Sequence, residues 1–474
     1  MLPAGGALEQ ARKARDPRFD GRFFVGVRTT GIYCRPVCAV KMPRAENVTF
    51  FDSAAAATEA GYRPCLRCRP EASPGTPAWQ GTSTTVRRAL KLIDDGALDQ
   101  GGIESLSDRL GVTSRHLNRL FRKHVGATPK TIAKTRRLQF AKRLIDETRL
   151  PMTEIAMSAG YGSIRRFNDH IKQTYDRSPT SLRQDRETTS PDSLTLRLPY
   201  RQPYDFDGIL DFFAIRATPG VEAVDTGYTR TFLLDGEAGR IRVADNVGDL
   251  ECTIEGGSSR SLMTILQKVR SMFDLNAIPD DINDVLLADS VLKKLVRKSP
   301  GLRLPGAFDP FEVAVRAIVG QQVSVKGATT VMGRVVELYG GESAFGRLFP
   351  TASRLAELRP KDLPMPEKRA LAIRELARRV ETGEVEFDHP DDDTFDESVL
   401  SIPGIGPWTA QYISMRARAN PNAFLEGDLV IKKVAKRLFD TDREAEILHR
   451  ADCWQPWRGY AGMHLWRYAA TLNV

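Results

Sequence analysis

The sequence lacks long apolar runs. No stretch of its 474 residues approaches the roughly 20 consecutive apolar residues that a helix needs to cross a bilayer. The first residues, MLPAGGALEQARKARD, contain no apolar core of the length found in signal peptides. The sequence therefore predicts a cytoplasmic protein without a membrane partner.

Cysteine is scarce as well. Six cysteines in a chain of this length are too few for a disulfide scaffold, and in a reducing compartment clustered cysteines more often hold metal or carry out chemistry. Four of the six fall within 35 residues, whereas Cys252 and Cys453 stand alone in apolar surroundings. We expect these two to be small buried side chains. The clustered four are Cys34, Cys38, Cys65 and Cys68.

The chain has no strong excess of one charge. Lysine and arginine number 69 against 60 acidic residues, which gives a net charge of +9. This mild basicity is compatible with a nucleic-acid partner but does not establish one. The length exceeds what one ordinary core can organise, so two to four domains are expected.

Composition changes along the chain mark the domains. Residues 70–83 and 184–193 are rich in Pro, Gly, Ser and Thr or in polar residues, a composition typical of linkers. The sequence between these two linkers is predicted to be helical. From 194 to about 260 short β-type runs such as LTLRL and GRIRVAD surround one amphipathic helix, and the remainder is predominantly helical. The predicted domains are therefore residues 1–76, 84–184, 194–285 and 286–474.

The clustered cysteines have the spacing of a metal site. A C-x3-C pair is followed after 26 residues by a C-x2-C pair, and each pair can place two sulfurs on one ion. Four thiolates satisfy tetrahedral zinc and leave no open position. Spacing alone favours a closed zinc site, whose role is only to stabilise the fold of its domain, and makes a catalytic site the less favoured alternative.

The sequence around these cysteines changes that balance. The stretches VRTTGIYCRPVC, RAENVTFF and GYRPCLRC strongly resemble the N-terminal domain of the Ada adaptive-response protein across residues 15–70. The resemblance implies one zinc ion held by Cys34, Cys38, Cys65 and Cys68. It further implies that Cys34 takes a methyl group from a methylphosphotriester in DNA, once per chain. Zinc would keep the sulfur deprotonated, and the thiolate is the nucleophile.

Methylation would also act as a switch. A zinc ion with four thiolate ligands carries a charge of −2, and one methylation takes it to −1, which weakens its repulsion from DNA phosphates. Three cations close to Cys34 and Cys38 in the sequence are expected to contact that backbone. They are Arg35, Lys41 and Arg44.

Residues 105–129 and 152–179 form a weak internal repeat. Each copy reads as a short helix, a glycine, an N-cap serine, a second helix and a Thr-Pro or Ser-Pro stop. Ser114 and Ser163 are the expected caps. The expected inward-facing residues are Leu117, Leu120 and Phe121 in the first copy and Ile164, Phe167 and Ile171 in the second.

Residues 86–183 resemble the AraC-type DNA-binding domain. In that family two helix-turn-helix units insert recognition helices into successive major grooves. The resemblance implies a transcription regulator, an activator, that binds double-stranded operator DNA and has RNA polymerase as a further partner. The exposed residue types on both helices are those that read base edges and phosphates. The expected DNA contacts are Arg115, Asn118, Arg119, Arg165 and Arg166.

A glycine hairpin marks the last domain. In LSIPGIGPWTAQYISMRA, Gly404 and Gly406 allow an unusual backbone turn that presents amides to a phosphate. Asp428 follows at the start of the next helix, in FLEGDLVIKKVAKRLF. The combination resembles the helix-hairpin-helix Gly-Pro-Asp superfamily of DNA glycosylases, although Glu-Gly-Asp stands here in place of the usual order.

Residues 194–474 resemble AlkA, the 3-methyladenine DNA glycosylase. The resemblance rests on PYDFDGILDFFAIRA, PGLRLPGAFDPFEVAVRAIVGQQVS, PGIGPWTAQY and WQPWRGYAGMHLW. It implies that Asp428 is catalytic and stabilises positive charge on the sugar as the N-glycosidic bond breaks. The alternative role of a lone aspartate at a helix start is an N-cap. Electron-rich rings would favour cationic alkylpurines after base flipping, and by resemblance they are Phe212, Trp408, Tyr412 and Trp466.

Three departures from related enzymes define the expected activity. Trp408 stands where bifunctional relatives carry a lysine, so no β-lyase step is expected. Only Cys453 lies near the C-terminal end, so no iron–sulfur cluster is expected. Gln322 replaces the leucine with which AlkA fills the vacated stack, so gap filling would be polar.

The sequence predicts a multidomain, mainly α protein. It would contain a small four-cysteine zinc domain, a double helix-turn-helix, a small α/β domain and an all-helical helix-hairpin-helix domain. No Pro-Cys-His-Arg string is present, so direct O6-methylguanine repair is not expected. The predicted function is a nucleoid-associated enzyme that repairs alkylated DNA and regulates transcription. The alternative is a damage-responsive transcription factor whose glycosylase-like half only binds DNA.

Overall fold

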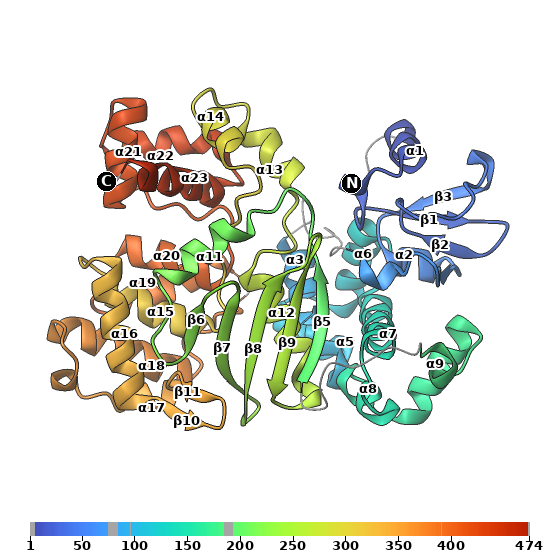
Figure 1. The fold of residues 1–474 in the computed structure, drawn as a ribbon, viewed down its shortest axis with the longest axis horizontal. Helices are drawn as coiled ribbons and strands as arrows, with labels where there is room; N and C mark the ends of the chain where they lie inside the picture. Colours follow the sequence, from blue (N-terminus) through green and yellow to red (C-terminus); the bar gives the residue numbers. More distant parts are fainter. Residues whose placement is uncertain (1–4, 74–83, 95, 184–192, 390, 473–474) are drawn as a thin grey trace. The chain divides into compact units, whose positions relative to one another are not determined.

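The computed structural model describes residues 5–73, 84–94, 96–183, 193–389 and 391–472. Within these residues no helix is long and apolar enough to cross a membrane. Most of the described chain is helical, and its strands are gathered in small sheets (Figure 1). The chain divides into two compact units: Met1–Arg201 with Val247–Gln267, and Gln202–Asn246 with Lys268–Val474.

The first unit starts with a small four-stranded sheet in the order β3-β1-β2-β4. β1 is antiparallel to β2 and β3, and β4 is parallel to β2. Phe24 and Tyr33, almost fully buried, meet edge to face with their ring centroids 5.8 Å apart. The elements are α1 (Gly5–Ala14), η1 (Pro17–Phe19), β1 (Phe24–Val27), β2 (Ile32–Cys34), η2 (Ala45–Asn47), β3 (Val48–Phe51), α2 (Ala54–Glu59), β4 (Arg63–Pro64) and η3 (Pro70–Ala72).

The predicted linker over residues 70–83 begins later than its composition suggests. Residues 70–72 form η3, which starts with a proline and packs against α7 (Pro129–Glu147). The Glu71 carboxylate is buried there, a contact that local composition does not reveal. The rest of this linker, 74–83, and residues 184–192 of the second lie outside the described residues.

Two helix pairs follow in the same unit, α5–α6 and α8–α9, joined by the long helix α7. Each second helix is followed by Thr-Pro or Ser-Pro, which starts a new helix because the hydroxyl caps it and proline fits its first turn. The elements are α3 (Thr84–Asp94), α4 (Ala97–Gln100), α5 (Ile103–Arg109), α6 (Ser114–Val125), α7, α8 (Met152–Ser158), α9 (Ile164–Tyr175) and α10 (Pro179–Leu182).

Two details of these helices differ from the prediction. The N-cap of α6 is Thr113, whose hydroxyl accepts the His116 N–H, and Ser114 is the first helical residue. Ile164 is 40% exposed because it begins α9, before the turn in which Phe167 starts to pack inward. Ser163 caps α9 as expected. Phe121, Leu117, Phe167 and Ile171 are fully buried and Leu120 is partly buried.

The two isolated cysteines behave differently from each other. Cys252 lies in β9 (Asp249–Gly256), which pairs antiparallel with β5 (Ser193–Pro199) in the first unit, and burial raises the pKa of its thiol to about 12. Cys453 is exposed, contrary to expectation, because it lies in the surface turn η6 (Asp452–Trp454), where Trp454 takes the buried position.

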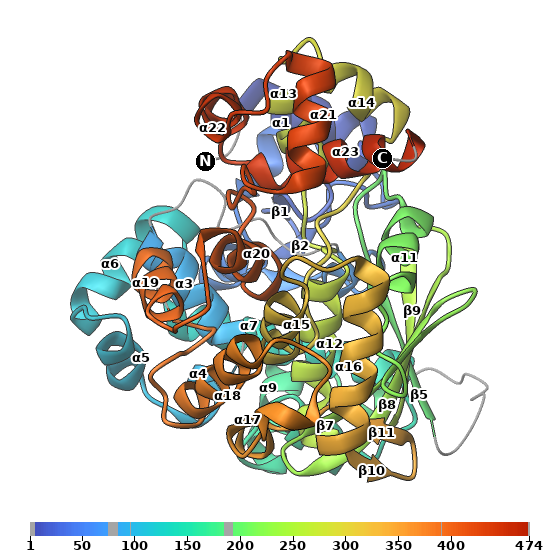
Figure 2. The same ribbon diagram turned by 90° about the vertical axis from the view of Figure 1, so that its left-hand side faces the viewer.

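The second unit combines the strands β6, β7 and β8 and the short pair β10–β11 with many helices. β7 is bonded antiparallel to β6 and to β8. The nearly all-buried α15 contacts α16, α18 and α20 (Figure 2), and α21 packs on α23. The elements are α11 (Phe206–Ala214), β6 (Glu222–Val224), β7 (Tyr228–Leu234), β8 (Glu237–Asp245), α13 (Pro279–Leu286), α14 (Leu292–Lys298), α15 (Pro310–Val319), α16 (Val325–Tyr339), β10 (Gly341–Ser343), β11 (Gly346–Leu348), α17 (Ala352–Ala356), η5 (Pro360–Asp362), α18 (Glu367–Glu381), α19 (Asp392–Leu400), α20 (Pro407–Ala417), α21 (Leu429–Phe439), α22 (Glu444–Ala451), η6 and α23 (Arg458–Thr471). Between β9 and α13 the chain forms η4 (Ser259–Ser261), which belongs to the first unit, and α12 (Leu262–Met272), which begins in the first unit and ends in the second.

Candidate functional site

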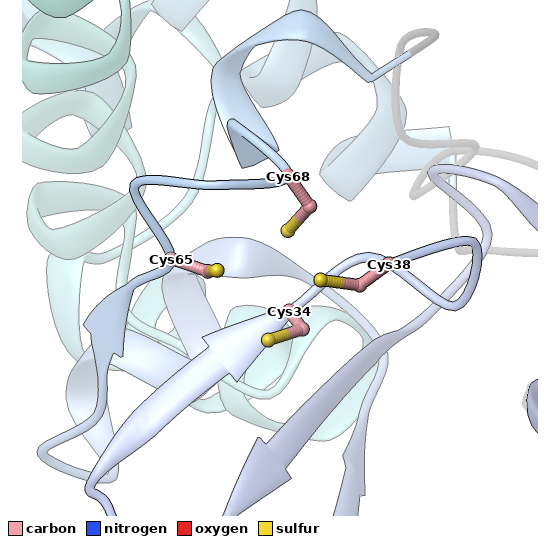
Figure 3. Close-up of side chains that lie close together, drawn as sticks. All are labelled: Cys34, Cys38, Cys65 and Cys68. Atoms are coloured by element: carbon pink, nitrogen blue, oxygen red, sulfur yellow. The ribbon is translucent and has the colours of Figure 1, made fainter. Parts of the chain in front are cut away.

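The four clustered cysteines converge on one point of the first unit. Cys34 ends β2 and Cys65 follows β4, and these strands lie side by side. All four sulfurs point inward and lie within 4.8 Å of one another (Figure 3). Tetrahedral zinc with four sulfur ligands spaces them about 3.8 Å apart. Four free thiols in this arrangement therefore fit one zinc ion with small movements.

The surroundings of Cys34 and Cys68 differ. Cys34 is 6% exposed, whereas Cys68 is the least buried of the four, so exposure alone would favour Cys68 as the reactive sulfur. Among the described residues, the Arg35 backbone N–H donates to the Cys68 sulfur at 3.4 Å. Such a bond draws electron density from a thiolate, which weighs against Cys68 as the nucleophile.

The three cations near the cysteines have different surroundings. The Arg35 guanidinium forms an ion pair with Asp20, donates to the Cys68 carbonyl at 3.2 Å and is only 18% exposed. These contacts hold Arg35 against the loop that carries Cys68, so its guanidinium is not free to contact a phosphate. Lys41 and Arg44 are exposed, and Arg44 lies 3.7 Å from Glu46.

The two helices predicted to contact DNA bases, α6 and α9, have most of their cationic side chains exposed. The arginines at the starts of α6 and α9 are exposed. Asn118 is half-buried, and its amide donates to the Ser114 carbonyl at 2.8 Å, so one of its hydrogen bonds is used within the helix. The exposed arginines are Arg115, Arg119, Arg165 and Arg166.

The glycine hairpin in the second unit connects α19 to α20. Gly404 has φ +94°, in the region that favours glycine, and Gly406 caps α20. Gln321, in the loop before α16, donates to the Gly404 carbonyl at 2.9 Å and to the Thr409 hydroxyl at 3.0 Å. Gln322 is exposed with φ +53°. The loop 321–324 is thus fastened to the hairpin by Gln321, which no local sequence pattern marks.

Asp428 is both an N-cap and the centre of a polar cluster. Its Oδ1 accepts the Val430 and Ile431 N–H groups at 3.0 Å each, which caps α21. The Trp466 indole N–H donates to the same oxygen at 3.1 Å, and the Trp408 indole N–H donates to Oδ2 at 3.2 Å. The side chain is half-buried, and all four contacts use it as an acceptor, the role of an ionised carboxylate.

The four predicted rings form two stacked pairs that meet at this carboxylate. Trp408 stacks on Tyr412 with centroids 5.4 Å apart, and Phe212 stacks on Trp466 at 6.4 Å. The pairs come from α20 on one side and from α11 and α23 on the other. Asp428 links them through the two indoles, so residues that lie far apart in the sequence share one site.

Two arginines that the sequence analysis missed border the rings. Arg416 donates to the Tyr412 hydroxyl at 2.9 Å and lies 4.5 Å from the centroid of the Phe212 ring, while Arg216 lies 3.8 Å from that centroid. Burial would raise the pKa of Tyr412, but Arg416 and Arg216 outweigh it and hold that pKa below its usual value. Burial lowers the pKa of Arg216 to about 10. Each arginine follows its ring by one helical turn, a spacing that could have revealed both.

Comparison with known families divides the chain into four matched regions. Residues 7–71 match the metal binding domain of Ada, and residues 106–185 match a helix-turn-helix domain. Residues 195–309 match the AlkA N-terminal domain, and residues 315–459 match the HhH-GPD superfamily of base excision DNA repair proteins. The four cysteines and Asp428 all fall inside matched regions.

Similar proteins exist for the whole chain and for its C-terminal part. A probable bifunctional transcriptional activator/DNA repair enzyme AlkA of Mycobacterium tuberculosis is 41% identical over 471 residues, covering 96% of this chain and 95% of the relative. DNA-3-methyladenine glycosylase 2 of Escherichia coli is 36% identical over 279 residues, covering 57% of this chain and 95% of that protein.

A solved structure supports the fold of the C-terminal part. The 3-methyladenine DNA-glycosylase from Archaeoglobus fulgidus superposes with a TM-score of 0.53 at 20% identity, covering 59% of this chain and 99% of that one. The near end-to-end match to the mycobacterial relative decides the family. The chain belongs to the bifunctional transcriptional activator/DNA repair enzymes that join an Ada-type metal-binding domain and a helix-turn-helix domain to an AlkA-type glycosylase of the helix-hairpin-helix superfamily.

Proposed function

We propose that the C-terminal half of this chain excises alkylated purines such as 3-methyladenine from double-stranded DNA. The N-terminal half would sense DNA methylation damage and regulate transcription. The observation that carries the enzymatic proposal is the carboxylate of Asp428, held by two indole N–H groups between two stacked ring pairs. An N-cap alone requires the contacts to the Val430 and Ile431 N–H groups but not the two indole donors.

The proposed excision uses Asp428 as its catalytic group. Cleavage of the N-glycosidic bond places positive charge on the sugar, and a fixed carboxylate lowers the energy of that cation and orients water toward it. The two indoles and the helix start hold the carboxylate still, so it is already arranged for the transition state. Rings beside it would stack on a flipped base and attract its positive charge.

We expect the reaction to stop at the abasic site. Trp408, at the place where bifunctional relatives carry an amine, stacks on Tyr412 and donates to Asp428, so it offers no nucleophile. Incubation with DNA that contains 3-methyladenine should release free base and leave a strand that breaks only after alkali. Strand cleavage without alkali, or a borohydride-trapped complex of protein and DNA, would contradict this prediction.

The hairpin offers a sharp test of DNA binding. An alanine Cβ at position 404 would lie 3.3 Å from the Ala372 Cβ at a φ of +94°, whereas one at position 406 would meet nothing within 4 Å. Left-handed strain costs about 1–2 kcal/mol, and a variant that relieves it by moving the hairpin must restore the hairpin when it binds. Gly404→Ala should therefore weaken binding to an abasic-analogue duplex about tenfold. Fluorescence anisotropy measures this, with Gly406→Ala as the matched control. Equal affinities for the two variants would refute this role of the hairpin.

We further propose that Cys34 accepts a methyl group from a DNA methylphosphotriester. Its sulfur would form a bond to the methyl carbon while the carbon–oxygen bond breaks, and the phosphodiester leaves with the electron pair. Bound zinc keeps the coordinated sulfurs deprotonated. The Arg35 N–H would draw electron density from the Cys68 sulfur, which favours Cys34 over Cys68 as the nucleophile. The product is a thioether, so each chain reacts once, and the loss of one negative charge favours contact with DNA.

A further inference from the structure

A second polar cluster lies outside the cysteine site, where the sensor module (residues 5–73) meets the reader module (residues 84–183). The Arg69 guanidinium, one residue after Cys68, lies 2.9 Å from Asp146 and 3.4 Å from Glu147 at the end of α7. Lys142 of the same helix pairs with Asp146 at 2.5 Å and faces Glu71 at 3.8 Å. The side chains of Lys142, Asp146 and Glu71 are at most 5% exposed, so these charges depend on one another.

The backbone of Arg69 connects this cluster to the loop that ends at Cys68. It has φ +50° and ψ +76°, a left-handed conformation that residues other than glycine hold only when their surroundings impose it. On one side the loop is held by Arg35, whose N–H donates to the Cys68 sulfur at 3.4 Å and whose guanidinium donates to the Cys68 carbonyl. On the other side the Arg69 side chain is held by α7. The conformation of Arg69 therefore depends on both modules.

The sensor also holds the beginning of α7. Ser53 donates to the Val125 carbonyl at 3.2 Å, and the Thr128 N–H donates to Glu59 at 2.9 Å. A Cβ added to Gly126 would lie 3.1 Å from the Ala56 Cβ, so α2 fits closely against the turn between α6 and α7. Contacts at both ends of α7 make the two modules one packed body, with the two helix-turn-helix pairs attached to that helix.

We infer that Arg69 couples metal loading of the four cysteines to the helix that carries the DNA-reading units. The inference rests on the proposed zinc site. When the four cysteines hold a zinc ion, the loop that ends at Cys68 is fixed, and the backbone of Arg69 is fixed with it. The Arg69 side chain then holds the end of α7 through Asp146 and Glu147. Coupling between two sites is reciprocal, so changes at the end of α7 must alter the affinity of the cysteines for zinc.

Zinc affinity of the full chain tests this reciprocity. Neither Asp146 nor Glu147 contacts a cysteine, yet Asp146→Asn and Glu147→Gln should each weaken zinc binding about tenfold, a typical size for coupling between sites. Competition with a chromophoric chelator measures this affinity. Asp108→Asn, an exposed acid of the same module, is the matched control and should leave the affinity unchanged. Unchanged affinity in both α7 variants, with normal helical circular dichroism, would overturn the coupling.

Two further measurements identify Arg69 as the connection. Arg69→Ala should weaken zinc binding as Asp146→Asn does, and the double variant should be no weaker than either single one; multiplied effects would overturn the role of Arg69. Hydrogen exchange at the end of α7 should respond to zinc removal in the wild type and in Arg67→Ala, whose side chain is exposed, but less in Arg69→Ala. A wild type that binds no zinc would instead refute the zinc site itself.

Discussion

Replacing Asp428 with asparagine is expected to slow single-turnover excision of 3-methyladenine by about 100- to 1000-fold, or about 3–4 kcal/mol of transition-state stabilisation. The substitution removes the negative charge that faces the developing sugar cation. Asparagine is also a good N-cap and can accept the Val430 and Ile431 N–H groups, so α21 should remain intact. The loss would therefore report chemistry and not folding. The measurement is release of free base from a duplex with excess enzyme.

The control for this experiment is a second N-cap aspartate of the same unit. Asp391 accepts the Thr394 N–H at the start of α19, away from the contacts that join the rings. Asp391→Asn should excise 3-methyladenine within about twofold of the wild-type rate, since surface caps contribute to stability and not to the reaction. If Asp428→Asn and the wild type release base at the same rate, the catalytic assignment is wrong and the N-cap role of Asp428 is sufficient.

Replacing Cys34 with serine is expected to abolish methyl transfer from DNA methylphosphotriesters. A serine hydroxyl is not deprotonated near neutral pH and is a poorer zinc ligand and nucleophile than a thiolate. Excision of 3-methyladenine should stay within about twofold of wild type, because catalysis there depends on Asp428. Transfer of radiolabelled methyl groups to the protein measures the first activity, and free-base release measures the second.

Serine replacements elsewhere make this experiment specific. Cys453→Ser changes an exposed thiol outside the cluster and should transfer methyl groups as the wild type does. Zinc content should be determined for each variant, because loss of the ion would explain inactivity without assigning the acceptor. Peptide mapping of the methylated wild type completes the assignment, and a methyl group on Cys68, the most exposed ligand, would contradict it.

The sequence predicted that the four cysteines lie together and that Asp428 begins a helix, because both depend on residue types in fixed local patterns. Two closely spaced cysteine pairs bring four sulfurs together once the strands that carry them pair. Asp428 begins a helix as its motif requires. The rings were placed by resemblance to a family, since nothing local in Phe212 or Trp466 indicates that they stack on each other.

What the sequence did not predict depends on contacts between distant segments. Glu71 lies in a stretch whose composition suggests a linker, yet α7 buries it. Gln321 takes its role from the Gly404 carbonyl, and Arg416 also donates to the Gly306 carbonyl at 3.1 Å; neither of these distant partners is visible in a local pattern. The exposure of Ile164 reflects its place in the first turn of a helix, which a periodicity of apolar residues does not resolve.

We propose that one chain combines a methyl acceptor that reacts once with a glycosylase that turns over many times. Mass spectrometry of the wild-type chain incubated with excess methylated DNA tests it most directly, by following protein methylation and free 3-methyladenine in the same sample. We predict that methylation stops at one group per chain, on Cys34, while free base continues to accumulate over many equivalents. Base release that stops at one equivalent or never begins, or a methyl group on another cysteine, would contradict the account.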